Sequence, residues 1–181
     1  MERNLTLVAL FAALIAALGL IPSFTLAFGV PITAQSLGVM LCGTVLGAKR
    51  GGLAALLFVA LVALGLPLLA GGRGGLGVFA SPTVGFLVGF PIGAFVTGLL
   101  VEKLRFGSLG VVAASASVVG GVIVVYIFGV IGMSVMLEKT LFEATLLVTA
   151  FIPGDLIKAI AAGAITVALY KARPNSVLSR A

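Results

Sequence analysis

Two charged side chains lie close together in a segment that is otherwise strongly apolar. Asp155 and Lys158 are three residues apart in FIPGDLIKAIAA, and this spacing places both groups on one face of a helix. Pro153, just ahead of them, suits the first turn of a helix, where the amides lack partners anyway. Within a membrane segment such ionisable residues mark ligand or ion sites by default, which favours a polar pocket. The structural alternative is a capping carboxylate with a lysine that reaches the membrane interface.

The composition indicates that the segment belongs to an integral membrane protein. Of 181 residues, 61% are hydrophobic and 9% are charged, whereas about 25% are charged in a typical soluble domain. A water-exposed surface would need far more polar area than this chain contains. We therefore expect residues 1–181 to form a single transmembrane domain in the lipid bilayer, without a separate soluble domain.

The residue types argue against several classes of function. The chain has no histidine and a single cysteine, Cys42, so no usual metal site and no Ser-His or Cys-His nucleophile is expected. Its eleven basic residues are dispersed singly or in pairs, which argues against a nucleic-acid partner. The phosphate-loop pattern GxxxxGKS/T is missing, so energy for any uphill transport would come from another subunit or an ion gradient.

Six apolar segments are candidates for membrane helices, since about 20 residues span a bilayer. The second and third have fifteen residues each, which is short for full spans, and the fifth offers a place to bend at Gly120-Gly121. The sequence thus predicts an all-α bundle of six transmembrane helices. The segments are 5–21, 32–46, 52–66, 83–101, 109–135 and 153–170.

The connections between these segments differ in charge. The termini and connections lie alternately on the two sides of the membrane. Those on the side of the N-terminus carry eight basic residues, and those on the other side carry two. Because basic residues accumulate in cytoplasmic loops, both termini are expected in the cytoplasm. Asp155 and Lys158 then lie near the outer face, together with two long connections, 22–31 and 67–82.

Further polar groups are expected at the same depth. Gln35 and Thr83 lie at the heads of two segments, and Arg73 lies in the connection before Thr83. Together they predict a polar cluster around an apolar opening, as is usual for a small-molecule site. The loop 71–77 contains a GxGxxG match, but without the βαβ unit that a dinucleotide site requires. We interpret it as a loop whose backbone can approach a ligand, with a plain flexible loop as the alternative.

Small residues recur at four-residue spacing on two segments and predict close helix contacts. For the glycines Gly85, Gly89 and Gly93, internal packing is expected. For Ala9, Ala13 and Ala17 the sequence leaves two alternatives open, internal packing or a partner protein, because no polar residue marks an inward face on that segment.

Three segments together resemble the BioY family, the biotin-specific substrate-binding subunits (S components) of energy-coupling factor transporters. They are GVPITAQSLGVMLCGTVLGAKRG, GLPLLAGGRGGLGVFASPTVGFLVGFPIGAF and IPGDLIKA. The resemblance implies an uptake protein of a prokaryotic cytoplasmic membrane, not an enzyme, with biotin as its transported ligand and no cofactor. It also implies a membrane-embedded coupling subunit and two cytoplasmic ATPases as partners.

The resemblance also implies roles for particular residues. Asp155 and Lys158 would contact the polar ends of biotin, because ureido N–H groups suit a carboxylate and the carbonyl or valeryl carboxylate suits an ammonium. Which end each one takes stays open. Arg73 is a further candidate for the carboxylate. The glycine loop would wrap the bicycle, Phe28 or Phe79 would pack on its sulfur-containing ring, and the alanine ridge would dock the coupling subunit. The loop glycines are Gly72, Gly74 and Gly75, and the ridge is Ala9, Ala13 and Ala17.

Three other functions compete with this interpretation. One is an S component for a different vitamin. Another is an ion-coupled secondary transporter with Asp155 as the proton site, which six helices without a clear inverted repeat disfavour. The third, an intramembrane Ser-Lys hydrolase, needs a serine beside Lys158, and the sequence nominates no candidate.

Overall fold

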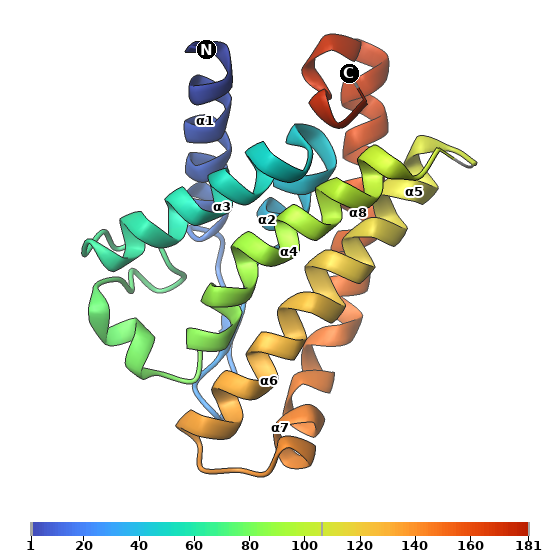
Figure 1. Ribbon diagram of the computed structural model, residues 1–181. Helices are drawn as coiled ribbons and strands as arrows, with labels where there is room; N and C mark the ends of the chain where they lie inside the picture. The colour runs from blue at the N-terminus through green and yellow to red at the C-terminus, as the bar shows by residue number, and fades with distance from the viewer. Residues whose placement is uncertain (1, 106, 181) are drawn as a thin grey trace.

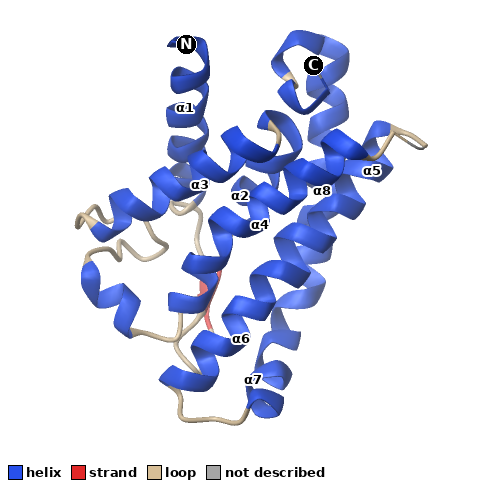
Figure 2. Cartoon of the chain, viewed as in Figure 1, coloured by secondary structure: helices blue, strands red, loops and turns tan. Residues whose placement is uncertain are grey.

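The structure is a computed structural model that describes residues 2–105 and 107–180, and it is almost entirely helical (Figures 1 and 2). A short antiparallel hairpin, with Phe24 opposite Ile32, interrupts the first connection. The main elements are α1 (Glu2–Leu18), β1 (Phe24–Thr25), β2 (Pro31–Ile32), α2 (Gln35–Leu46), α3 (Ala48–Ala63), α4 (Val84–Lys103), α5 (Leu109–Ala116), α6 (Val125–Met136), α7 (Leu141–Val148) and α8 (Ile152–Ala172). Short helical turns are η1 (Leu76–Ala80), η2 (Ser117–Val124), η3 (Thr149–Phe151), η4 (Pro174–Ser176) and η5 (Leu178–Arg180).

The helices confirm the predicted all-α membrane bundle. Three described helical runs are long and apolar enough to cross a membrane by length and composition: Val84–Lys103, Leu109–Met136 and Leu141–Ala172. By contrast, α2 has 12 residues and is about 18 Å long, against about 30 Å for the hydrocarbon core. Most of its residues are buried, so this helix lies inside the bundle and away from lipid.

Two helix starts differ most from the predicted ones. The third helix begins at Ala48 instead of residue 52, directly after Gly47, whose φ of 83° is a conformation that favours glycine. The last helical run begins at Leu141 instead of residue 153, because Thr140 and Glu143 form a capping box. Pro153 lies in the first turn of α8, inside this run.

The place where the fifth segment was predicted to bend, Gly120-Gly121, lies in η2, a π-helical stretch between α5 and α6. The helical run continues through this stretch, but its winding changes from α-helical to π-helical. Such π-bulges are frequent at functional sites. The glycines also allow close approach: a Cβ on Gly93 of α4 would lie 2.6 Å from the carbonyl oxygen of Gly120. Internal packing of the glycine ridge on α4 is thereby confirmed.

Both termini lie at the same end of the bundle, and the turn between α6 and α7 lies at the other (Figure 1). A hydrogen bond from Arg3 Nη2 to the carbonyl oxygen of Asn175, at 3.1 Å, joins the start of α1 to the segment after α8. Lys49 and Arg50 begin α3 and Lys103 ends α4, and all three line one hollow with the start of α1. The basic residues of three predicted cytoplasmic connections therefore gather at one end.

Candidate functional site

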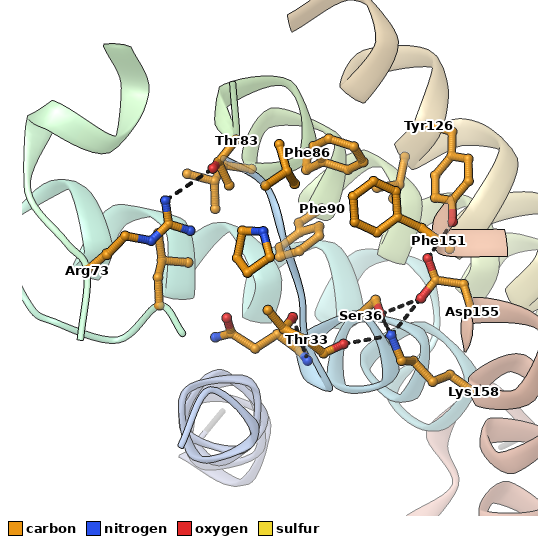
Figure 3. Close-up of a pocket in the computed structure, with 17 residues that line it drawn as sticks. Thr33, Ser36, Arg73, Thr83, Phe86, Phe90, Tyr126, Phe151, Asp155 and Lys158 are labelled. Atoms are coloured by element: carbon orange, nitrogen blue, oxygen red, sulfur yellow. Dashed lines mark hydrogen bonds and ion pairs between the residues drawn. The ribbon is translucent and has the colours of Figure 1, made fainter. Parts of the chain in front are cut away.

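A pocket lies among α2, α4, α6 and α8, beside the two long connections (Figure 3). Its empty space is about 590 Å³, a figure that includes the open mouth. Apolar and aromatic side chains form its middle, and polar groups stand at two opposite ends (Figure 3). Such a pocket suits an elongated ligand with polar groups at both ends and an apolar body.

Asp155 dominates one end and accepts hydrogen bonds from three different elements. Its Oδ1 accepts from Ser36 Oγ of α2 at 2.9 Å and from Lys158 Nζ of α8 at 2.8 Å. Its Oδ2 accepts from the hydroxyl of Tyr126 of α6 at 2.6 Å. Asp155 is only 6% exposed, and a buried carboxylate requires such partners to offset the loss of hydration.

Lys158 is satisfied in the same way. Besides Asp155, its ammonium donates to the backbone carbonyl oxygen of Thr33 at 2.6 Å and to Ser36 Oγ at 3.0 Å. An ammonium has three N–H donors, so all of them are used. Asp155 and Lys158 therefore bind each other and α2 while they line the pocket. The capping alternative is wrong, because the carboxylate accepts from side chains and not from the first amides of α8.

Ser36 is the serine that the sequence did not nominate for Ser-Lys chemistry. Its hydroxyl donates to Asp155, and it accepts from an ammonium that donates to three acceptors. Neither group is then arranged as a nucleophile with a base, because the lysine nitrogen offers no lone pair to the hydroxyl proton. The arrangement holds two charges in place and does not resemble a hydrolytic dyad.

Aromatic side chains form the wall between the two ends. Phe86 and Phe90 are four residues apart on α4 and so share a face. Phe86 lies 5.7 Å from Phe151 and 6.2 Å from Tyr126, between ring centroids. None of these rings was predicted from the sequence, where the four-residue spacing was the one available signal and a weak one in a chain with 12 phenylalanines.

Arg73 stands at the opposite end of the pocket from Asp155 (Figure 3). Its Nε donates to the carbonyl oxygen of Ala70 at 3.4 Å, and its Nη1 donates to Thr83 Oγ1 at 3.3 Å. Both bonds are long, so they hold the guanidinium weakly. Arg73 and Thr83 line the same pocket as Asp155 and Lys158.

Gln35 also lines the pocket, but its amide holds the second long connection in place. Its Nε2 donates to the carbonyl oxygens of Ile15 and Leu68 at 3.1 and 3.0 Å, and its Oε1 accepts from the Ala70 amide at 3.3 Å. Gln35 is 2% exposed, so it joins the end of α1 to the loop that carries Arg73. Its position makes it a support for the site.

The other predicted site residues lie behind the pocket wall or in the loop. Phe28 packs edge-on against Phe151, with ring centroids 6.1 Å apart, and Phe79 packs against the core. Gly72 and Gly75 adopt φ values of 70° and 79°, which favour glycine. These residues shape the loop and the wall, and the pocket lining consists of other side chains. Gly74 packs closely on the backbone of Leu66, so it too shapes the loop and does not line the pocket.

The alanine ridge lies on the outside of the bundle. Ala9, Ala13 and Ala17 are all exposed, whereas Ala12 is buried and Ala16 is half-buried. The small residues of α1 that pack inward are thus Ala12 and Ala16. Internal packing does not account for the ridge, and contact with a partner protein stays a prediction.

Comparison with known proteins gives a consistent result. A family model described as the BioY family matches residues 2–175. The chain is 50% identical to the biotin transporter BioY of Rhodobacter capsulatus over 99% of this chain and 100% of that protein. It is 54% identical to the biotin transporter BioY of Rhizobium etli over 88% and 89% of the two chains. The crystal structure of an S-component for biotin from an ECF-type ABC transporter superposes with a TM-score of 0.88 at 34% identity, covering 94% of this chain and 92% of that one.

Proposed function

Because the chain belongs to the BioY family, we propose that it is the biotin-binding S component of an energy-coupling factor transporter and serves biotin uptake. The observation that carries the proposal is the pocket with polar groups at two ends and aromatic rings between them. Biotin has the matching shape, with a ureido ring at one end, a carboxylate at the other and an apolar body between.

The ureido ring binds at the Asp155 end. A carboxylate offers about four acceptor positions, and three donors occupy Asp155. Among the residues that the structure describes, Oδ2 accepts from Tyr126 alone, so it has room for one ureido N–H without the loss of an existing bond. The hydroxyl groups of Ser36 and Tyr126 can both donate and accept, so either can reorient to donate a hydrogen bond to the ureido carbonyl oxygen.

The valeryl carboxylate binds Arg73 at the other end. A guanidinium carries five N–H donors, and the bonds to Ala70 and Thr83 use two of its nitrogens at long distances. Nη2 is therefore available to a carboxylate, and exchange of two weak bonds for a charge-assisted pair is favourable. Phe86, Phe90 and Phe151 pack along the bicycle between the two ends.

The partners are a membrane-embedded coupling subunit and two cytoplasmic ATPases. The exposed small residues Ala9, Ala13 and Ala17 suit close contact with a helix of the coupling subunit. The excess of basic residues at the end that carries both termini supports a cytoplasmic position for that end, in a prokaryotic cytoplasmic membrane.

A biotin titration of the purified protein tests the proposal. We expect biotin to be retained through detergent exchange and to raise the unfolding temperature, since a ligand that binds only the native state stabilises it. A screen in which another vitamin shifts the unfolding temperature and biotin does not would overturn the specificity. Uptake that stops with a protonophore while ATP stays high would favour an ion-coupled transporter.

A further inference from the structure

The first turn of α2 is connected to both polar ends of the pocket. Ser36 Oγ donates to Asp155 Oδ1 at 2.9 Å and accepts from Lys158 Nζ at 3.0 Å. Gln35, the residue before it, bonds instead to the loop that carries Arg73. Because successive residues of a helix point about 100° apart, neighbours on one turn can reach different sides. Asp155 and Arg73 stand at opposite ends of the pocket (Figure 3), so this turn is a common support for both ends.

The side-chain amide of Gln35 pairs with the backbone of the loop at two points. Its Nε2 donates to the carbonyl oxygen of Leu68 at 3.0 Å, and its Oε1 accepts the N–H of Ala70 at 3.3 Å. Nε2 also donates to the carbonyl oxygen of Ile15 in α1 at 3.1 Å, so both of its N–H donors are used. Only a side chain that carries both a donor and an acceptor can make this pairing.

One loop residue, Ala70, links Gln35 to the guanidinium of Arg73. The N–H of Ala70 donates to Gln35, and its carbonyl oxygen accepts from Arg73 Nε at 3.4 Å. The N–H of Leu69 donates to the carbonyl oxygen of Arg73 at 3.0 Å and closes the turn 69–73. Ala70 and Leu69 are both buried. A displacement of Ala70 therefore moves the backbone and the side chain of Arg73 together.

This turn needs support from outside because it is rich in glycine. Residues 67–75 include four glycines, and Gly71 and Gly72 adopt φ values of 76° and 70°. Glycine loses more conformational freedom on ordering than any other residue, so the turn would sample many shapes without its bonds to Gln35. Those bonds select one shape and place Arg73 before a ligand arrives. Such preorganisation lowers the cost of binding.

The end of α1 leaves Gln35 little room to shift. A Cβ on Gly19 would lie 2.8 Å from Gln35 Nε2 and 2.7 Å from the carbonyl oxygen of Leu68. A Cβ on Gly38 of α2 would lie 3.1 Å from Ile15 Cα, and Ile15 is fully buried. The end of α1, the start of α2 and the loop thus meet in one tight contact around this amide.

We propose that Gln35 determines specificity: it holds Arg73 at a fixed distance from Asp155, so that the pocket selects the chain length of the acid that it binds. This inference rests on the proposed function, in which Asp155 binds the ureido ring and Arg73 the carboxylate. A side chain one methylene shorter leaves a gap at the guanidinium, and a longer one must bend or displace the turn. Gln35 is then a positioning residue that acts through Arg73.

Isothermal titration calorimetry of the full-length protein tests the proposal with four ligands. They are biotin, norbiotin and homobiotin, whose side chains are one methylene shorter and longer, and biotin amide. We expect the unchanged protein to bind biotin roughly tenfold or more tightly than the other three. Gln35→Leu should weaken biotin roughly tenfold and leave biotin amide nearly unchanged, so that the four affinities converge. Gln35→Asn keeps an amide that is too short to reach the loop and should have the same effect, should the leucine variant not fold.

Thr44→Val is the matched control for a loss of stability. It removes a buried hydroxyl near the other end of α2, which accepts from Thr166 Oγ1 at 2.9 Å. This variant should lower the unfolding temperature and retain the preference for biotin. An equal loss for all four ligands in the Gln35 variants, or an undiminished preference for biotin, would overturn the role of Gln35.

The proposed function fails by a different result. An unchanged protein that binds none of the four ligands would contradict biotin binding itself. An unchanged protein that binds biotin, norbiotin and homobiotin equally would leave biotin binding in place and overturn the selection of chain length.

Discussion

The hydroxyl of Tyr126 donates to Oδ2 of Asp155 at 2.6 Å and so joins α6 to α8 across 29 positions of the sequence. Tyr126 is the second residue of α6, directly after the π-helical stretch η2. A π turn adds a residue to the winding and so rotates the side chains that follow. The unusual stretch in the fifth segment therefore contributes to the orientation of a pocket residue.

Tyr126→Phe should weaken biotin binding by roughly fivefold, because it removes one hydrogen bond of about 1 kcal/mol from the carboxylate. Isothermal titration calorimetry measures the change. Tyr170→Phe, on the exposed side of α8, is the matched control and should bind as the unchanged protein does. Equal affinity in both variants would show that Tyr126 does not orient Asp155 for the ligand.

Asp155→Asn should weaken biotin binding by at least about 1.4 kcal/mol, a tenfold change in the dissociation constant. The amide loses the charge that Lys158 neutralises, and its NH2 group would face donors instead of acceptors. Glu138→Gln removes an exposed carboxylate and should have no effect. An unchanged dissociation constant for Asp155→Asn would mean that the carboxylate serves the structure alone.

Arg73→Gln should distinguish the two ends of the ligand. If Arg73 binds the valeryl carboxylate, the variant loses roughly tenfold in affinity for biotin, as expected for a charged hydrogen bond, and little for biotin amide. Competition binding with both compounds measures this difference. Lys139→Gln, on the same side of the bundle, is the control, and a parallel loss for both ligands would place Arg73 away from the carboxylate.

Ala13→Leu should abolish assembly with the coupling subunit and leave biotin binding intact, because a leucine prevents the close approach that the exposed ridge allows. Co-purification with the coupling subunit and ATPases reports assembly. Ala164→Leu enlarges an exposed alanine of α8 and should assemble normally. If Ala13→Leu assembles as well, the coupling subunit docks elsewhere.

Gly93→Ala should destabilise the bundle by about 1–3 kcal/mol, as expected for overpacking. The added Cβ would lie 2.6 Å from the carbonyl oxygen of Gly120 and from Val125 Cγ2. Thermal unfolding in detergent measures the effect. Gly154→Ala, where a Cβ meets nothing within 4 Å, is the control, and similar unfolding temperatures for the two variants would contradict the tight α4–η2 contact.

The sequence by itself determined the features that depend on composition and local spacing. The excess of apolar residues requires a membrane bundle, and the lengths of the segments locate most helices. The pair Asp155 and Lys158 is visible because two charges in an apolar helix are costly. The two helix starts with the largest errors are Ala48 and Leu141, where a glycine turn and a capping box decide the boundary.

Only the tertiary structure decided what surrounds that pair. Ser36 reaches Asp155 across 119 positions and Tyr126 across 29, and no local pattern encodes such contacts, because they result from the packing of α2 and α6 against α8. The same packing buries Gln35 as a support and leaves the alanine ridge exposed. The chain sequence thus specifies the charges of the site, and the helix packing specifies their partners.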